Sequence, residues 1–398
     1  MRKLLASPVK MALSDAENTI YQSILQYATE LSLNLMAVKV VEHPENFLNW
    51  STELLRITTE DLNQDLMDPP QFVPLKKMQD LLEKAISLSQ LKTTKIAPWV
   101  IYSDFIQAQS TVQALDERFR LLDHIDSIRS TPLAQMTELD LLAFAGKHTN
   151  QHDFNIYDFD CEWFGSTKGA KVFHAILQTK AHELDKALAH IPLEGEVTHE
   201  HYQAFVAAYT ELFTTYTENK PAGEKAGVAP ATRLLAMRRP DQFVALTNAK
   251  VDVICQGLSI TKFNNFNFDG YWNELVLAVR SFAWWRKAQP EATDENEVEQ
   301  KIWRNRAILL DLYLFASPEL AGQSNYVRLR DKPVSTRKAS GTTRTKRTKE
   351  TAEMIVDKRL ASDDMPAYMQ NKRNALISEV KLGKNIDQVI TLMRKIFG

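Results

Sequence analysis

Residues 14–35 read SDAENTIYQSILQYATELSLNL and open with a helix start signal. Ser14 and Glu17 stand three residues apart, the spacing of a capping box, in which each side chain accepts the other residue's backbone N–H. Apolar side chains then recur at helical spacing, at Ile20, Ile24, Ala28, Leu31 and Leu35. Helix start signals and apolar residues at helical spacing occur again later in the chain. The sequence therefore predicts a mainly α-helical, multi-helical protein.

A further helix is predicted from Thr137 to Gly146, because glycine commonly ends helices. The aromatic stripe of Tyr202, Phe205, Tyr209 and Phe213 is typical of a buried helix face. Short strands are a minor expectation, at Trp99–Ile101 and Phe243–Leu246. More helices are predicted at Lys171–His190, Thr198–Tyr216, Ala231–Met237, Ala249–Gln256, Gly270–Phe282 and Glu297–Phe315.

The chain of 398 residues is too long for one typical core. An N-terminal helical domain is expected over residues 1–150. A central, aromatic-rich helical domain with a Gly/Lys loop and an arginine cluster is expected over 151–320. A basic flexible linker (321–350) and a small C-terminal helical module (351–398) complete the predicted organisation.

The composition is that of an ordinary globular protein, with 44% hydrophobic and 25% charged residues and a net charge of −2. It makes no general case for nucleic acid or for a membrane, and no run approaches the roughly 20 apolar residues of a membrane span. Two cysteines, Cys161 and Cys255, fit a reducing compartment. A cytoplasmic location, no membrane association, no cofactor and no metal are expected.

The segment from Arg328 to Lys349 is the strongest local signal, because Asp331 alone opposes its many cations. Ser, Thr and Gly lie between these cations, a composition that favours a weakly ordered chain able to neutralise phosphates without reading sequence. A docking arm for an acidic protein and an inert tether are the alternatives. The cations are Arg328, Arg330, Lys332, Arg337, Lys338, Arg344, Lys346, Arg347 and Lys349.

Two further stretches suit phosphates. Lys168 and Lys171 lie in a glycine-containing loop before a predicted helix, where free N–H groups attract anions; an ordinary glycine turn is the alternative. Its spacing is not that of a Walker A loop. Three arginines lie in and just after a short predicted helix and could form bidentate hydrogen bonds to phosphate oxygens: Arg233, Arg238 and Arg239. The alternative is a structural ion-pair site that uses the neighbouring Asp241.

No catalytic residue is expected. His174, His182 and His190 recur every eight residues and therefore do not share one face of a helix. The adjacent Trp284 and Trp285 favour packing over base stacking. A weak alternative is a Mg²⁺-dependent nuclease that uses the acidic cluster of Asp153, Asp158, Asp160 and Glu162.

Several motifs between residues 163 and 312 carry a resemblance to a known group. They are Trp163–Ser166 with Lys168–Ala170, then Ala231–Met237, Arg239–Val244, Tyr271-Trp272 and Trp284-Trp285. This middle part resembles an uncharacterised bacterial domain associated with restriction and phage-defence loci. Where that pattern has an Asp-Ser pair after Phe-Val, this chain has Leu246-Thr247-Asn248.

The resemblance implies a setting that faces nucleic acid. Together with the basic stretches it favours a non-catalytic or accessory DNA-binding component of a bacterial multi-protein system in antiviral defence. DNA would be held largely without sequence specificity, beside a protein partner such as an ATPase or nuclease. A protein-interaction adaptor that binds no nucleic acid is the alternative.

Overall fold

The computed structural model of the chain describes residues 11–32, 40, 42–218, 225–291, 293, 296–331, 352–361, 365, 367–381, 384 and 386–397. It divides into two compact units, Met1–Lys332 and Pro333–Gly398. Across these described ranges the regular structure is helical and no strand occurs, which confirms the predicted mainly α class. No helix in them is long and apolar enough to cross a membrane.

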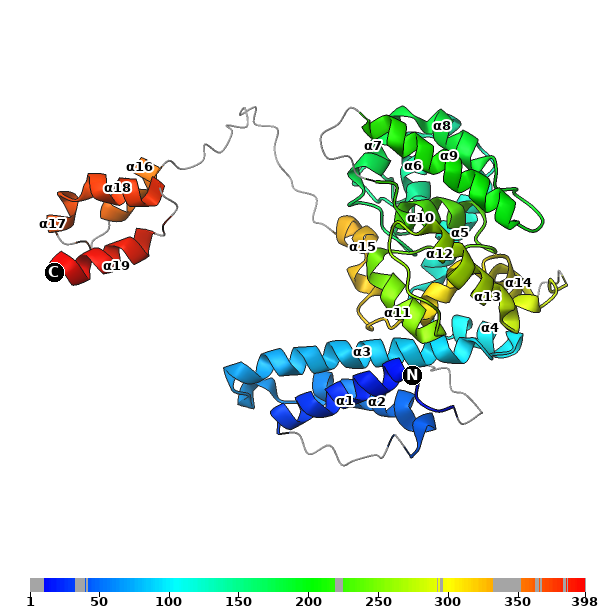
Figure 1. The fold of residues 1–398 in the computed structure, drawn as a ribbon, viewed down its shortest axis with the longest axis horizontal. Coiled ribbons are helices and arrows are strands. Elements are labelled where there is room, and N and C mark those ends of the chain that lie inside the picture. Colours follow the sequence, from blue (N-terminus) through cyan, green and yellow to red (C-terminus); the bar gives the residue numbers. More distant parts are fainter. Residues whose placement is uncertain are drawn as a thin grey trace. The chain divides into compact units, whose positions relative to one another are not determined.

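The first unit is drawn from blue to light orange in Figure 1. Its longer α-helices alternate with single turns of 3₁₀-helix and with two π-helical stretches, Ile57–Asp61 and η6 (Tyr271–Val276). The α-helices are α1 (Asp15–Glu30), α2 (Phe47–Arg56), α3 (Phe72–Thr94), α4 (Trp99–Gln107), α5 (Leu115–Ile128), α6 (Glu138–Ala145), α7 (Lys171–Thr179), α8 (Ala181–Leu188), α9 (His199–Thr217), α10 (Val228–Arg238), α11 (Asn248–Leu258), α12 (Phe268–Gly270), α13 (Leu277–Ser281), α14 (Glu297–Arg304) and α15 (Asn325–Arg330). Among the 3₁₀ turns, η7 (Trp284–Arg286) and η9 (Ile308–Tyr313) bear on the site.

The N-terminal helices α1 and α2 pack on α3 around a core of their own. The capping box is confirmed: Glu17 N donates to Ser14 Oγ at 3.2 Å, and Ser14 N donates to Glu17 Oε2 at 2.8 Å. Of the predicted stripe, Ile20, Ile24, Ala28 and Leu31 are buried, and Leu35 lies outside the described residues.

Helix α3 belongs to two cores. Figure 1 shows it between the α1–α2 pair and α11. Its residues from Leu75 to Leu88 pack in the N-terminal core, whereas Leu91 packs in the larger one. Gly257 of α11 lies so close that a Cβ there would stand 2.6 Å from Leu91 Cβ. The larger core runs on to Tyr313 without a break near residue 150, where the sequence had placed a domain boundary.

Aromatic rings fill the larger core. Tyr102 stacks on Trp284 with ring centroids 4.1 Å apart, and the predicted aromatic stripe of α9 is buried throughout. The strands expected at 99–101 and 243–246 were wrong: α4 begins at Trp99, and Phe243–Leu246 is buried without a strand partner. The predicted helix 171–190 is two helices that meet at Lys180, where φ is −136° and ψ is 32°.

The second unit contains α16 (Ala352–Leu360), α17 (Ala367–Gln370), α18 (Arg373–Lys381) and α19 (Ile386–Phe397). A small apolar core of Val356, Leu360, Met369, Leu376, Ile377, Val389 and Ile390 holds them together. An ion pair between Arg373 and Asp357 joins α18 to α16. The C-terminal part therefore has a hydrophobic core of its own.

Candidate functional site: an arginine-tryptophan cleft

A cleft of about 770 Å³ opens in the first unit between elements that are far apart in the sequence. Its walls come from α5, the loop 193–196, the turn after α10, α13, η7 and the end of α14. We call it the arginine-tryptophan cleft and define it by Arg239, Asp241, Arg280, Trp285, Trp303 and Arg306.

Arg239 and Asp241 form a bidentate ion pair at the base of the cleft. Arg239 Nε donates to Asp241 Oδ1 at 2.8 Å, and Nη2 donates to Oδ2 at 2.9 Å. Arg239 Nη1 also donates to the Pro192 carbonyl at 2.7 Å. Burial opposes the ionisation of Asp241, but hydrogen bonds from Arg239 and Gln242 outweigh it and lower the pKa of Asp241. The structural ion pair that the sequence left open therefore exists, and together with the carbonyls of Pro192 and Gly195 it occupies most of the donors of Arg239.

Arg280 and Arg306 are held differently, because each rests on tryptophan rings. The guanidinium carbon of Arg306 lies 4.6 Å from the ring centroid of Trp285 and 4.4 Å from that of Trp303. Arg280 lies 4.9 Å from the centroid of Trp272 and donates to the Val197 carbonyl at 3.0 Å. Within the described residues, the Nε atoms of both arginines are buried and have no hydrogen-bond acceptor.

The base of the cleft holds more positive than negative charge. Arg239, Arg280 and Arg306 face one carboxylate at the base, that of the half-buried Asp241. Arg280 has only a loose contact of 3.5 Å to Glu196, whose side chain is 79% exposed, so water screens this pair. Arg306 is 6% exposed, and in the described part of the chain no carboxylate lies within 4.0 Å of it.

Burial lowers the pKa of both Arg280 and Arg306. The cause is the cost of taking a cation out of water, which a buried anion would offset. The carboxylates of Glu196 and Asp241 offset this cost only in part.

The mouth of the cleft carries both signs of charge. Lys301 contacts Asp123 at 3.0 Å and Arg129 contacts Asp126 at 2.6 Å, both with exposed carboxylates. Glu194 and Glu196 add two more exposed carboxylates. The mouth is therefore a rim of mixed charge around the arginines at the base.

Arg233, which the sequence placed among the phosphate-binding residues, is fully buried in α10. Its guanidinium donates to four main-chain carbonyls, those of Ala143, Phe144, Cys161 and Trp163. Two of these carbonyls lie at the end of α6, where the helix dipole favours a cation. Its burial and its four carbonyl partners leave Arg233 no access to a phosphate, so the structure corrects this assignment to a packing role.

Arg238 is half-buried, and its Nη1 donates to the Arg129 carbonyl at 2.8 Å. Lys168 and Lys171 are exposed, and Lys168 Nζ lies 4.0 Å from Glu162. Their loop lines a second cavity of about 350 Å³, to which the N-terminal ends of α7, α10 and α11 also contribute. Of the predicted phosphate-binding residues that the structure describes, only Arg239 belongs to the arginine-tryptophan cleft.

The basic segment begins at α15. Arg328 and Arg330 are exposed, and Arg330 pairs with Asp331 at 2.7 Å and lies over the ring of Tyr326. The remaining predicted contacts, Lys332, Arg337, Lys338, Arg344, Lys346, Arg347 and Lys349, lie outside the described residues.

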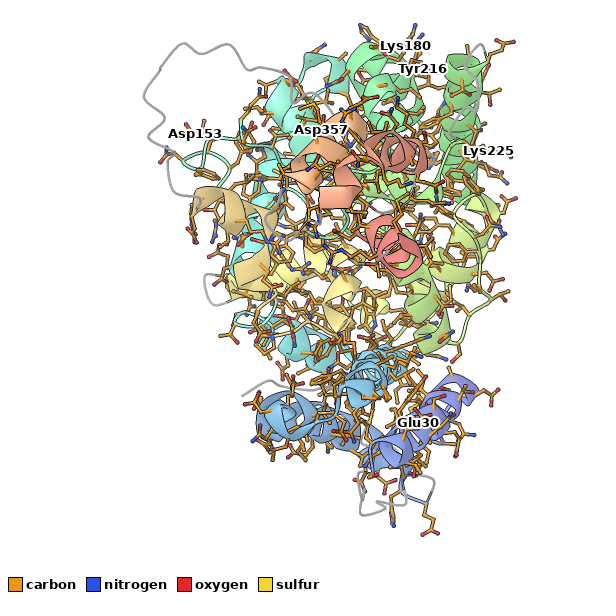
Figure 2. All side chains as sticks on the ribbon, turned by 90° about the vertical axis from the view of Figure 1, so that its left-hand side faces the viewer. Glu30, Asp153, Lys180, Tyr216, Lys225 and Asp357 are labelled. Atoms are coloured by element: carbon orange, nitrogen blue, oxygen red, sulfur yellow. The ribbon has the colours of Figure 1, made fainter. Side chains whose placement is uncertain are left out.

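The acidic cluster near Cys161 does not converge on a common point. Asp153 is exposed at the edge of the unit and accepts bonds from Asn155 (Figure 2). Asp158 pairs with Arg120 at 2.9 Å. Asp160 accepts from the backbone N–H groups of Asn325 and Tyr326, and so anchors the start of α15. These separate roles leave no shared oxygen cage of the kind that Mg²⁺ needs.

The described residues bring together one set of three potential metal ligands, His148, His152 and Cys161, with ligand atoms within 4.8 Å of one another. The two imidazole rings stack with centroids 4.7 Å apart, and in the described residues His148 Nε2 is buried without a hydrogen-bond partner. His152 bonds through both ring nitrogens, to Thr149 and to the Leu139 carbonyl. Burial raises the pKa of the Cys161 thiol well above its ordinary value, which disfavours a thiolate. The set is therefore a packed aromatic contact.

Arg280, Arg306 and Trp303 escaped prediction. Arg280 lies in α13, Trp303 in α14 and Arg306 in the turn after α14, and no sequence motif joins them. The one usable signal was Trp285, which the sequence analysis assigned to packing; its neighbour Trp284 does pack in the core. No family model, no curated protein and no solved structure matches the chain.

Proposed function

We propose that this protein binds nucleic acid as a non-catalytic component of a larger system, and that the arginine-tryptophan cleft supplies the specific contact. The observation that carries the proposal is a pair of arginines, the half-buried Arg280 and the buried Arg306, which rest on tryptophan rings and have no buried carboxylate within 4.0 Å in the described residues. Phosphate is one of the two groups, with carboxylate, whose oxygens match the planar donors of a guanidinium.

Aromatic rings beside the arginines favour a nucleotide over a simple anion. Trp285 and Trp303 are half-buried and line the cleft, so part of each ring is accessible. Stacking of a base on an aromatic ring contributes about 1–3 kcal/mol whatever the base, because every base has a π-face. A cleft of about 770 Å³ also falls in the usual range for small-ligand sites.

The basic segment supports the same function in a second way. Its cations can neutralise phosphates of a strand without reading the sequence, and this contribution falls steeply with salt. In the setting that the resemblance implies, the partner would be an ATPase or nuclease of a bacterial defence system. The strand would be DNA, held in the cytoplasm.

The test is a binding titration of the full chain with labelled single-stranded and duplex DNA over a range of salt concentrations. We expect log affinity to fall linearly with log salt. Replacing Arg337, Lys338, Arg344, Lys346, Arg347 and Lys349 with glutamine should flatten that slope, whereas Lys186→Gln, an exposed cation of α8, should leave it unchanged. Absence of binding to either form of DNA at low salt would favour the protein-interaction adaptor.

A further inference from the structure

The charges of the cleft distinguish between two kinds of phosphate. A phosphodiester inside a strand carries one negative charge, whereas a phosphate monoester carries about −1.5 to −2 at pH 7. The groups at the base hold three positive charges, on Arg239, Arg280 and Arg306, against one negative charge on Asp241. The surplus of two positive charges matches a monoester.

The hydrogen-bond donors of the cleft also favour a phosphate monoester over an internal phosphodiester. In the described residues Arg306 donates one hydrogen bond, from Nη1 to the Trp303 carbonyl at 2.9 Å, and its Nη2 has no acceptor, whereas Arg280 donates to Val197 and Gln242. A buried donor left unsatisfied costs about 1–3 kcal/mol. A monoester has three terminal oxygens to offer, and an internal phosphodiester has two.

The rim argues against a continuous strand. At the mouth Asp123 and Asp126 are paired with Lys301 and Arg129, so Glu194 and Glu196 of the loop 193–196 are the exposed carboxylates that a passing strand would meet. A polyanion that crosses the mouth would place further phosphates beside these carboxylates, and like charges at short range are repelled. A ligand with one terminal phosphate, followed by a base, places its single strong anion at the arginines and its uncharged part at the rim.

We infer that the arginine-tryptophan cleft recognises a phosphate monoester attached to a nucleoside, either at the end of a strand or as a free nucleotide. This inference rests on the proposed function for its ligand class, but it assigns the cleft to a terminus and leaves internal phosphates to the basic segment. Arg280 and Arg306 hold the monoester, and Trp303 or Trp285 contacts the base.

The experiment compares a short oligodeoxythymidine with a 5′-phosphate and the same strand with a 5′-hydroxyl, by fluorescence anisotropy with the label at the 3′ end; a matched pair with a 3′-phosphate and a 5′ label completes the set. We expect one terminal phosphate to raise affinity at least about tenfold, the effect of one or two charge-assisted hydrogen bonds. Arg306→Met, which keeps an unbranched side chain between the tryptophans, should abolish that difference. Lys186→Gln should keep it.

A competition on the unaltered protein keeps the test independent of how the variant folds. Thymidine monophosphate should displace the phosphorylated strand, and thymidine should not. If phosphorylated and unphosphorylated strands bind equally and the monophosphate does not compete, the inference is overturned while the proposed function stands. If no strand binds but the monophosphate binds in direct titration, the proposed function fails and the cleft is a site for a free nucleotide.

Discussion

Two regions of the first unit bury arginine in opposite ways. Around Arg233, four main-chain carbonyls from two segments meet one guanidinium, and the charge is used up in holding those segments together. In the arginine-tryptophan cleft, Arg306 makes one hydrogen bond and rests on two rings. The comparison teaches that burial alone does not separate a structural arginine from a binding one. The number of satisfied donors and the presence of an adjoining cavity do.

The largest effect is expected at Arg233. Arg233→Met removes the partner of four carbonyls at once, and it should lower the free energy of unfolding by about 3–5 kcal/mol. Urea unfolding followed by circular dichroism measures this change. A loss below about 1 kcal/mol would show that water replaces the guanidinium and would remove the contrast with the cleft.

Two buried histidines show how burial affects a side chain that can lose its charge. Burial lowers the pKa of His174, and likewise that of His148, to about 4, from an ordinary value of 6.5. Between pH 6.5 and pH 4 the unfolded chain therefore binds protons that the folded chain does not, so stability falls as the pH falls through this window. Each histidine contributes up to about 1.4 kcal/mol per pH unit.

Urea midpoints recorded from pH 7 down to pH 4.5 check this dependence. His174→Gln should reduce the dependence of stability on pH. His190→Gln should leave it unchanged, because His190 is exposed. An unchanged slope in His174→Gln would mean that the folded protein accepts the proton on this ring, against its buried position.

A smaller change in stability is expected at Arg306. Arg306→Met loses one hydrogen bond and the ring contacts but relieves a buried, uncompensated charge, so the free energy of unfolding should change by about 1 kcal/mol or less. Thermal unfolding of the variant beside Arg233→Met measures the difference directly. A loss as large as that of Arg233→Met would make Arg306 structural and end the comparison.

The smallest effect is expected at the rim. Arg304 is exposed, and its Nη2 lies 3.5 Å from Gln300 Oε1. Arg304→Gln should leave stability within about 0.5 kcal/mol of the original protein. Its affinity for a phosphorylated strand should fall by only a few-fold, because water screens an exposed cation. A loss of affinity as large as that in Arg306→Met would indicate that the phosphate binds at the mouth of the cleft and not at its base.

The fold class could be predicted from the sequence because its signals are local. The capping box at Ser14 and the aromatic stripe of α9 each depend on residues within a few turns of one helix, and both were confirmed. The candidate site could not be predicted in the same way. Arg233, Arg238 and Arg239 look alike in the sequence, yet they differ in structure because their partners come from residues 129–163 and 192–195.

The cleft itself was beyond prediction for the same reason. Arg239, Arg280 and Arg306 are spaced by tens of residues, and nothing in the pattern around each says that their helices meet. Trp284 and Trp285 are neighbours in the sequence but differ in their surroundings. Trp284 is buried in the core, and Trp285 lines the cleft. A change of one position around a helical turn decides between packing and access to a ligand.

Helix α3 gives the first unit a property that neither of its cores has alone. The N-terminal part of α3 completes the core with α1 and α2, and Leu91 of the same helix packs against Gly257 in the larger core. If either core unfolded, α3 would lose part of its packing, and the other core would lose a helix that it needs. The two cores should thus melt in one cooperative transition. An isolated fragment that begins at α4 would leave the apolar face that Leu91 now covers open to other chains, and should aggregate.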